Sequence, residues 1–411
     1  MWRGESRLRD GGGGTAVSSP GTLIVGGGLA AVRIAEQLRR NDYADAITIV
    51  GAEAHLPYDR PPLSKQMLRG EVDDVALKPA AFYAQHRIGL RLGVAAVGVD
   101  VRGHTVTLAD GQVLRYDQLV IATGLVPRRI PALGELDGIH VLRSFDDCLA
   151  LRERASSARR AVVIGAGFIG CEVSASLRGS GLDVVLVEPQ PTPLASVLGE
   201  QVGALVSRLH RDEGVDVRTG VQVVTVSGAG QVESVTLSDG SVIPADLVIV
   251  GIGSRPASDW LAGSDIAVAD GIVCDAVGRT SAPDVWALGD VASWRDGTGS
   301  QARVEHWSNA AEQARRLATA MLGRDAVAGA GVPYFWSDQY DIKIQCLGHP
   351  RAGDTVHLVE DFDVQTRRFL AYYERGGVLA AVVGAGIPEQ VRTARGKIAA
   401  GAPISEVLQP V

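Results

Sequence analysis

The sequence has few cysteines, and none of them is placed to form a local redox dithiol or a zinc-binding knuckle. Cys148, Cys171, Cys274 and Cys346 are the four cysteines of the 411 residues, and no CxxC motif occurs. The eight histidines form no HxxxH or HExxH pattern, so the sequence does not support a metal site. Widely spaced cysteines are typical of a reducing compartment, and we expect a cytoplasmic protein.

Features of nucleic-acid-binding and membrane proteins are also missing. The formal net charge is −7, which leaves no basic footprint for nucleic acid. No apolar run reaches the roughly 20 residues that a membrane-spanning helix needs. The first 21 residues are rich in Gly and have no apolar core, which predicts a flexible tail and not a signal peptide. With 46% hydrophobic and 21% charged residues, the rest of the chain is expected to fold into two or three soluble domains.

Two segments share one pattern of an apolar strand, a Gly-rich turn and an amphipathic helix. They are TLIVGGGLAAVRIAEQL, residues 22–38, and AVVIGAGFIGCEVSASL, residues 161–177. A single Gly-rich turn would be weak evidence, but a turn between a strand and a helix is the fingerprint of a dinucleotide-binding unit. The free N–H groups at the start of such a helix bind phosphates.

The glycines of the second turn have separate predicted roles. Gly165 makes the tight turn, Gly167 admits a pyrophosphate, and Gly170 lets helix and strand pack closely. In the first turn Ala31 stands at the third position, and it is small enough for the packing role. The sequence therefore predicts two nucleotide sites.

Each copy is followed by a second strand that ends near an acid, Glu53 in the first unit and Glu188 in the second. A carboxylate there accepts hydrogen bonds from ribose hydroxyls and repels a 2′-phosphate. The residues after Glu188 read PQPTPLAS, with no Arg or Lys to receive that phosphate. The second unit is therefore predicted to prefer NADH over NADPH, the alternative being that Glu188 is a merely solvated strand end.

A second internal repeat supports the duplication. VTLADGQVLRYDQLVIATG, residues 106–124, aligns without a gap with VTLSDGSVIPADLVIVGIG, residues 235–253. Each predicts a strand, an Asp-Gly hairpin turn and a buried parallel strand. From residue 328 onward, alternating apolar residues and turn signals predict further strands. The predicted fold class is α/β, with two Rossmann-like domains and a small C-terminal α/β domain.

The segment PYDRPPLSK, residues 57–65, is unusually stiff. Pro61 and Pro62 restrict their own φ angles and those of the residues before them. They form a defined loop that ends at Lys65. The plain alternative is a helix entry capped by Ser64, which would leave Lys65 in solvent.

In combination these features resemble a known family. RPPLSK, ATG, IGAGFIG followed by Glu172, ALGD, EHWSNAAEQA and YFWSDQY occur in order from residue 22 onward. The sequence resembles the FAD-dependent pyridine nucleotide-disulfide oxidoreductases with a glutathione-reductase-like fold. Within them it is most similar to the ferredoxin reductases of bacterial oxygenase systems, of the putidaredoxin reductase and biphenyl dioxygenase reductase type.

The resemblance implies that the first unit binds FAD and the second binds NADH. The implied domains are a flexible tail over 1–21, an FAD-binding domain over 22–126 and 255–327, an NAD-binding domain over 127–254, and a C-terminal domain over 328–411. The positions implied in FAD binding are Gly26, Gly28, Ala30, Glu53, Arg60, Lys65, Ala96, Thr123, Gly124, Arg143, Asp290, Trp307 and Trp336. Those implied in NADH binding are Gly165, Gly167, Ile169, Gly170, Glu188 and Gly253, with Phe168 near the flavin face. Relatives often carry an acid where Ala52 stands, so the FAD ribose is assigned to Glu53.

The resemblance also brings Lys65 to the flavin on the side where nicotinamide arrives, together with Glu172. We predict that these two form an ion pair beneath N5 of the flavin and are the catalytic residues. A buried pair is costly unless both charges are matched and hydrogen-bonded, which would explain the rigid loop. Lys65 would favour negative charge on the reduced flavin.

The predicted reaction takes electrons from NADH through FAD to a [2Fe–2S] ferredoxin that supplies a haem-thiolate monooxygenase or an aromatic-ring dioxygenase. No cysteine lies between Met1 and Cys148, which argues against a peroxidase or a coenzyme A disulfide reductase, because either would need a cysteine near the flavin. Rubredoxin, a quinone or a peroxide stays open as the acceptor, and an apoptosis-inducing-factor-like binding protein is a further alternative. The protein is expected to be a monomer or homodimer.

An acidic ferredoxin would dock on basic side chains near the flavin edge. The candidates are Arg60, Arg69, Arg315, Arg316 and Lys343.

Overall fold

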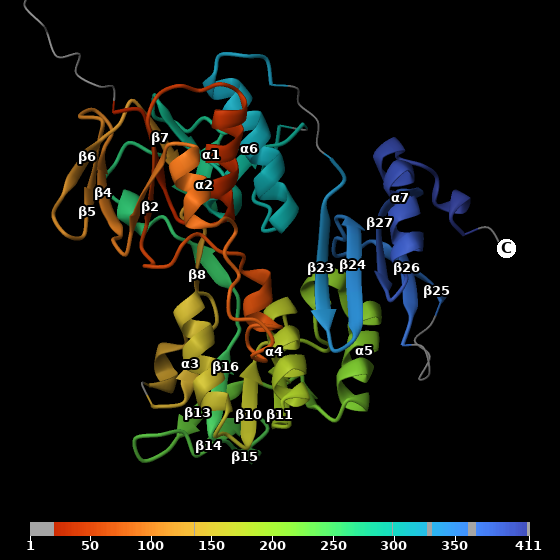
Figure 1. The fold of residues 1–411 in the computed structure, drawn as a ribbon. Helices are drawn as coiled ribbons and strands as arrows, with labels where there is room; N and C mark the ends of the chain where they lie inside the picture. Colours follow the sequence, from red (N-terminus) through yellow and green to blue (C-terminus); the bar gives the residue numbers. More distant parts are fainter. Residues whose placement is uncertain (1–19, 135, 298, 327–330, 361–366, 409–411) are drawn as a thin grey trace, which may run out of the picture.

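The computed structural model describes residues 20–134, 136–297, 299–326, 331–360 and 367–408. The predicted flexible tail over 1–21 lies outside this description except for its last two residues. Figure 1 shows two α/β units, one above the other, and a third, antiparallel unit beside the second. Within the described ranges, no helix is long and apolar enough to cross a membrane.

The first unit is built on a five-stranded parallel sheet with the order β20-β7-β1-β2-β3. Strands β1 and β20 are buried along their whole length, as in sheets covered on both faces, whereas the edge strand β3 is mostly only partly buried. Helices α1 and α6 pack against each other beside this sheet. The elements are β1 (Thr22–Val25), α1 (Leu29–Arg40), β2 (Ile47–Gly51), α2 (Ala80–Gln85), β3 (Ile88–Leu92), β7 (Gln118–Ile121), β20 (Val285–Ala287) and α6 (Trp307–Met321).

The second unit repeats this plan with the sheet order β12-β11-β10-β16-β9, again all parallel. A capping box between Ser144 and Asp147 begins its first helix, and Gly199 breaks the regular helical conformation of its longest one. The elements are β9 (Ile139–His140), α3 (Phe145–Ala155), β10 (Arg160–Ile164), α4 (Phe168–Gly179), β11 (Asp183–Glu188), α5 (Ala195–Asp212), β12 (Asp216–Thr219) and β16 (Leu247–Val250).

Each unit also carries a three-stranded antiparallel sheet. The hairpins turn at Gly111 and Gly240, which both have φ of 85°, and each leads into a central parallel strand. The predicted pattern of strand, Asp-Gly turn and buried strand is therefore confirmed in both copies. The strands are β4 (Ala96–Asp100), β5 (Thr105–Leu108) and β6 (Val113–Arg115), and β13 (Val223–Ser227), β14 (Ser234–Leu237) and β15 (Val242–Pro244).

The chain crosses between the two units through a pair of antiparallel strands, β8 (Leu125–Pro127) and β17 (Ser254–Pro256). After β17 it returns to the first sheet, where β20 pairs with β7. A further sheet in this returning part contains β18 (Val268–Ala269), β19 (Gly271–Cys274), β21 (Ala292–Arg295) and β22 (Gln301–Ala302). The boundaries predicted between the domains stay a prediction.

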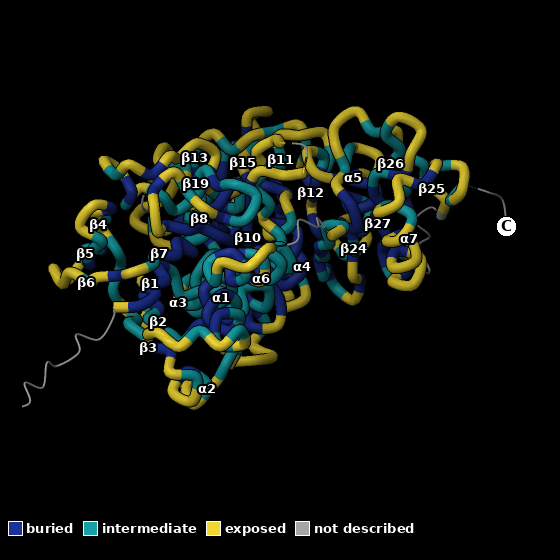
Figure 2. Tube along the Cα trace, turned by 90° about the horizontal axis from the view of Figure 1, so that it is seen from above, coloured by how far each residue is buried: buried dark blue, intermediate teal, exposed yellow. Residues whose placement is uncertain are grey.

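The C-terminal unit is a five-stranded antiparallel sheet with the order β23-β24-β27-β26-β25, covered by one helix. Its strand β23 packs on α4 of the second unit, and one apolar cluster joins side chains of both units. Figure 2 shows that the buried residues follow the strands and inner helix faces through all three units. The elements are β23 (Tyr334–Gln339), β24 (Ile342–Gly348), β25 (Thr355–Glu360), β26 (Phe369–Arg375), β27 (Val378–Ala385) and α7 (Pro388–Ala400).

Candidate cofactor-binding site

A cavity of about 760 Å³ opens at the carboxyl ends of the first sheet's strands. Residues 26–30 follow β1, residues 52–53 follow β2, residues 122–125 follow β7, and residues 289–290 follow β20. In this sheet β2 and β3 lie on one side of β1, and the later strands β7 and β20 lie on the other. Open α/β sheets bind ligands at the point where the strand order reverses in this way.

Most of the predicted cofactor-binding residues line this one cavity, although they come from distant parts of the chain. The predicted residues in its wall are Gly26, Gly28, Ala30, Glu53, Arg60, Lys65, Ala96, Thr123, Gly124, Arg143, Phe168, Ile169, Glu172, Asp290, Trp307 and Trp336. The other predicted positions lie outside its wall, in the second unit, and they are Gly165, Gly167, Gly170, Glu188 and Gly253. Their roles in cofactor binding stay predictions.

The first Gly-rich turn has the geometry of a phosphate cradle. Gly26 has φ of 124°, and a Cβ there would lie 2.2 Å from the backbone oxygen of Ala122. A Cβ on Gly28 would meet nothing within 4 Å. Gly28 is also the N-cap of α1 and offers no side-chain cap. No side chain of the cap therefore occupies the first N–H groups of the helix, which begins in the cavity wall. A pyrophosphate fits these donors.

The second turn repeats this arrangement. Gly165 has φ of 95°, and a Cβ on Gly170 would lie only 1.9 Å from the Gly165 carbonyl oxygen. Gly167, the N-cap of α4, again has open space at its Cβ position and no side-chain cap. The turn therefore fits a second pyrophosphate.

Glu188 is held beside the second turn. Its carboxylate accepts hydrogen bonds from the backbone N–H groups of Ala166, at 2.7 Å, and Gln190, at 2.9 Å. Glu188 is thus held in place and is not a free strand end, and its role toward the ribose stays a prediction. These bonds fix the carboxylate at the end of β11, where the ribose role was predicted.

Glu53 is engaged by two neighbours in the structure. It accepts a hydrogen bond from the Tyr58 hydroxyl at 2.6 Å and pairs with Arg60 at 2.9 Å. Arg60 also donates to the backbone oxygen of Arg143. The Glu53 carboxylate therefore lines the cavity and also orients Arg60, and its predicted contact with the FAD ribose stays a prediction.

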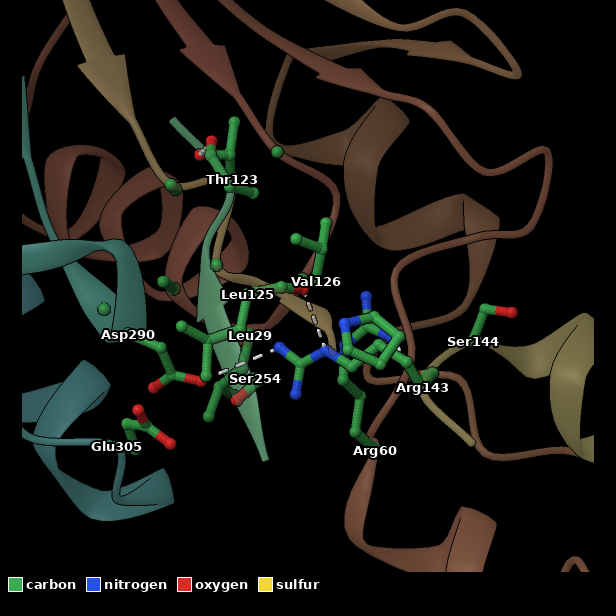
Figure 3. Close-up of a pocket in the computed structure, with 18 of the residues that line it drawn as sticks. Leu29, Arg60, Thr123, Leu125, Val126, Arg143, Ser144, Ser254, Asp290 and Glu305 are labelled. Atoms are coloured by element: carbon green, nitrogen blue, oxygen red, sulfur yellow. Dashed lines mark hydrogen bonds and ion pairs between the residues drawn. The ribbon is translucent and has the colours of Figure 1, made fainter. Parts of the chain in front are cut away.

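Arg143 and Asp290 form the polar side of the cavity. Figure 3 shows Arg143 reaching from the backbone oxygen of Leu125, at 3.2 Å from its Nε, toward Asp290, at 3.7 Å from its Nη2. Burial raises the pKa of Asp290, while Arg143 acts in the opposite direction. Thr123 donates to the Ala257 backbone oxygen at 2.8 Å. Such paired, cavity-facing groups fit a polyol or an amide-rich ring.

Lys65 and Glu172 form the predicted ion pair, with 2.7 Å between Lys65 Nζ and Glu172 Oε2. The two residues are only 5% and 3% exposed. Glu172 also accepts from the hydroxyls of Ser64, at 2.5 Å, and Ser337, at 2.8 Å, while Lys65 donates to the Pro61 backbone oxygen at 3.0 Å. The predicted pair is confirmed, and its place beneath flavin N5 stays a prediction.

The Pro-rich loop forms a short 3₁₀ helix over Pro61–Ser64, and Lys65 follows directly at its C-terminal end. Because Ser64 lies inside that helix and donates its hydroxyl to Glu172, its proposed role as an N-cap is wrong. The alternative that Lys65 is solvated is wrong as well.

Sequence reasoning missed several side chains at the site. Asp59 accepts a hydrogen bond from the Trp307 indole at 2.7 Å, and Phe335 packs edge-on against Phe168 with 5.0 Å between ring centroids. His306 lines the cavity with a buried Nδ1 that has no partner among the described residues. Burial and the nearby His349 lower its pKa to about 4. Asp59, His306 and Phe335 all lie inside the motifs quoted above, PYDRPPLSK, EHWSNAAEQA and YFWSDQY, and this position was their signal in the sequence.

The cysteines take no part in the cavity wall. All four are free and buried, and none of them lines the cavity. Burial raises the pKa of the Cys148 thiol to about 11 and that of Cys274 to about 12. Across the described residues, no group of His, Cys, Asp and Glu could hold a metal ion.

Four of the five basic candidates for ferredoxin docking lie outside the cavity wall. Arg69, Arg315 and Lys343 are paired with the neighbouring Glu71, Glu312 and Asp338. Arg316 lies half-buried over the Trp294 ring and donates to a backbone oxygen. Arg316 is thus more engaged than a free surface cation, and the docking role of all five candidates stays a prediction.

Comparisons with known proteins agree with this site. The family model described as pyridine nucleotide-disulphide oxidoreductase matches residues 21–314, and the one described as reductase C-terminal matches residues 334–408. The chain belongs to the pyridine nucleotide-disulphide oxidoreductase family. This membership confirms the predicted fold class and the prediction of an oxidoreductase that uses FAD and a pyridine nucleotide.

The resemblance to reductases of oxygenase systems is confirmed too. Rhodocoxin reductase of Rhodococcus erythropolis is 37% identical over 93% of this chain and 90% of its own. The ferredoxin–NAD(+) reductase component of the p-cumate 2,3-dioxygenase system of Pseudomonas putida is 39% identical over 80% of this chain and 82% of its own. The crystal structure of the covalent putidaredoxin reductase–putidaredoxin complex matches with a TM-score of 0.90 and 32% identity, covering 95% of both chains.

Proposed function

We propose that this protein is an NADH-dependent flavoprotein reductase that passes electrons from NADH through FAD to a [2Fe–2S] ferredoxin supplying an oxygenase. One observation carries the proposal. Phe168, Ile169 and Glu172, which follow the second nucleotide turn, line the cavity that begins at the first turn. A nicotinamide held by the second unit would therefore reach a flavin held by the first.

The side chains of the chain bind and orient the two cofactors. The N-termini of α1 and α4 receive the pyrophosphates, and Glu188 receives the ribose of NADH. Bound FAD would supply the chemistry that links a two-electron hydride donor to single-electron transfer. The overall reaction converts NADH and two oxidised ferredoxins into NAD⁺, H⁺ and two reduced ferredoxins. Lys65, held by Glu172, places a fixed positive charge where negative charge develops.

The acceptor is assigned to a ferredoxin because no cysteine lines the cavity, which leaves no thiol to carry the electrons onward. Rhodocoxin reductase and the p-cumate system reductase are named for such electron transfer. A rubredoxin, a quinone or a peroxide is the alternative acceptor, and an apoptosis-inducing-factor-like binding role is the alternative to an enzyme. We place the protein in the cytoplasm, as a monomer or homodimer.

The test is NADH-driven reduction of candidate [2Fe–2S] ferredoxins, followed by their visible absorbance, beside rubredoxin, a quinone and ferricyanide. We expect fast reduction of at least one ferredoxin. If the kcat/KM for rubredoxin or the quinone exceeds that for every ferredoxin tested, the alternative acceptor is the correct one. A protein that turns over slowly with all of them but forms a long-lived reduced complex would support the binding role.

A further inference from the structure

A chain of buried hydrogen bonds runs from Glu172 away from the cavity. Ser337 Oγ lies 2.8 Å from Glu172 Oε1, and Gln339 Nε2 lies 3.2 Å from Ser337 Oγ. Beyond them, His210 Nε2 lies 3.1 Å from Gln339 Oε1, and the Tyr340 hydroxyl lies 2.8 Å from His210 Nδ1. The chain thus joins α4, β23 and α5 through side chains alone.

The direction of every hydrogen bond follows from the charge on Glu172. An ionised carboxylate only accepts, so Ser337 gives it its single proton and can only accept from Gln339. The Gln339 amide must then present its NH₂ to Ser337 and its oxygen to His210. His210 consequently carries its proton on Nε2 and accepts from the Tyr340 hydroxyl at Nδ1.

The location of the chain makes this order strict. Ser337, Gln339 and His210 are 0% exposed, and a reversed donor would leave a polar atom unpaired in a low-dielectric interior. Burial lowers the pKa of His210 to about 4, so the ring is neutral at pH 7. The four donors therefore all point toward the carboxylate that holds Lys65.

We propose that Ser337, Gln339 and His210 are positioning residues that hold the Glu172 carboxylate correctly oriented against Lys65. The C-terminal sheet would thereby complete the hydride-transfer site through β23. This inference rests on the proposed function only in so far as Lys65 and Glu172 serve hydride transfer. It deepens that function by extending the site to residues outside the cavity wall.

The first test reads the His210 ring directly in the holoenzyme. Protein labelled with ¹⁵N-histidine is examined by long-range ¹H–¹⁵N NMR, and His210→Gln identifies the signal. We expect the Nε2–H tautomer at pH 7 and a shift of its Hε2 proton in Glu172→Gln, three hydrogen bonds away. An Nδ1–H tautomer, a charged ring, or an Hε2 proton unmoved in Glu172→Gln would overturn the proposal.

The second test is kinetic, with a control at the same interface. Gln339→Leu removes the two hydrogen bonds that Gln339 makes, to Ser337 and to His210. Tyr340→Phe removes only the outermost bond, from Tyr340 to His210. Tyr373→Phe removes a different buried bond between the same units, from Tyr373 to the Leu198 backbone oxygen at 2.7 Å. We expect Gln339→Leu to slow flavin reduction by NADH at least fivefold, roughly the worth of one net hydrogen bond, Tyr340→Phe to slow it less, and Tyr373→Phe to leave it unchanged.

The outcomes separate this inference from the proposed function. An equal effect of Tyr373→Phe and Gln339→Leu would mean general loosening of the interface and would overturn the positioning role. If Gln339→Leu fails to fold, Tyr340→Phe takes its place. A wild-type rate of flavin reduction together with a wild-type chemical shift of the His210 Hε2 proton in Tyr340→Phe would also overturn the positioning role. The predicted tautomer in a protein that reduces no ferredoxin would contradict the proposed acceptor while leaving the hydrogen-bond chain standing.

Discussion

At the scale of single residues, the pair of Lys65 and Glu172 shows how two buried charges are tolerated. Removing both charges from water is expensive, and their attraction compensates only when the remaining donors and acceptors are satisfied. Glu172 accepts from the hydroxyls of Ser64 and Ser337 in addition to Lys65, and Lys65 also donates to Pro61. The structure therefore places an oriented ion pair in the wall of the cavity.

Replacing either member of the pair should slow hydride transfer. We expect Lys65→Met and Glu172→Gln each to reduce the rate of flavin reduction in stopped-flow experiments by about tenfold or more, because a preorganised charge is lost. The double variant should be less impaired than the two single effects multiplied, since both remove one interaction. FAD content is measured first.

The control is Lys397→Met, which removes a partly exposed lysine of α7 that donates to a backbone oxygen. It should leave flavin reduction unchanged. Wild-type rates in Lys65→Met and Glu172→Gln at full FAD occupancy would remove both from the reaction.

Glu188 should determine the choice of nucleotide. We expect NADH to exceed NADPH in kcat/KM by more than tenfold, and tenfold corresponds to about 1.4 kcal/mol. Glu188→Ala should narrow the gap, mainly by raising KM for NADH. Glu188→Gln separates the two causes, because it removes the charge that repels a 2′-phosphate but keeps an oxygen for the N–H of Ala166. Equal efficiency with both nucleotides in the wild type would contradict the assignment.

At the scale of elements, each strand–turn–helix unit divides the work among its glycines. In the second turn, a Cβ added to Gly170 would lie only 1.9 Å from the Gly165 carbonyl oxygen, so only glycine fits there. A Cβ added to Gly167 would meet nothing within 4 Å. Gly167 also has a negative φ, −72°, that any residue can adopt. Packing requires Gly170 but not Gly167, and the approach of a nucleotide phosphate stays our predicted reason for Gly167.

Matched alanine substitutions test this division. Gly170→Ala should lower the free energy of unfolding by about 2 kcal/mol or more, as overpacking does. Gly167→Ala should leave the melting temperature nearly unchanged but raise KM for NADH by about tenfold, the equivalent of 1.4 kcal/mol. A Gly167→Ala protein with normal KM would show that no phosphate approaches this turn.

At the scale of the whole molecule, the sequence predicted what depends on local pattern. Both nucleotide turns, both Asp-Gly hairpins and the C-terminal strands follow from turn chemistry and apolar periodicity. The polar contacts of the site do not, because Ser64 and Ser337 lie 108 and 165 positions from the Glu172 they hold. No periodicity relates residues at such separations, so the hydrogen-bond chain to His210 was visible only in three dimensions.

Association with an acidic ferredoxin should depend on salt. The chain itself carries a net charge of −7, so docking relies on local cations such as Arg69 and Lys343. We expect ferredoxin-dependent turnover to fall as ionic strength rises beyond about 0.1 M. Glu71→Gln, which frees Arg69 from its partner, should increase the low-salt rate.

Ferricyanide reduction serves as the salt-insensitive control for this measurement. Ferredoxin turnover that stays flat from low to high salt would contradict electrostatic docking.

The return of the chain to its first sheet has a consequence for biosynthesis. All strands of the second sheet precede β20 in the sequence, whereas the first sheet lacks its edge strand until β20 is made. The cavity is completed later still, by Gly289 and Asp290, by α6, and by Phe335 and Trp336 of β23. On a translating ribosome, the nucleotide-binding insert can therefore fold while the domain that surrounds it is unfinished. We therefore expect flavin capture to be a late event that follows the synthesis of β23.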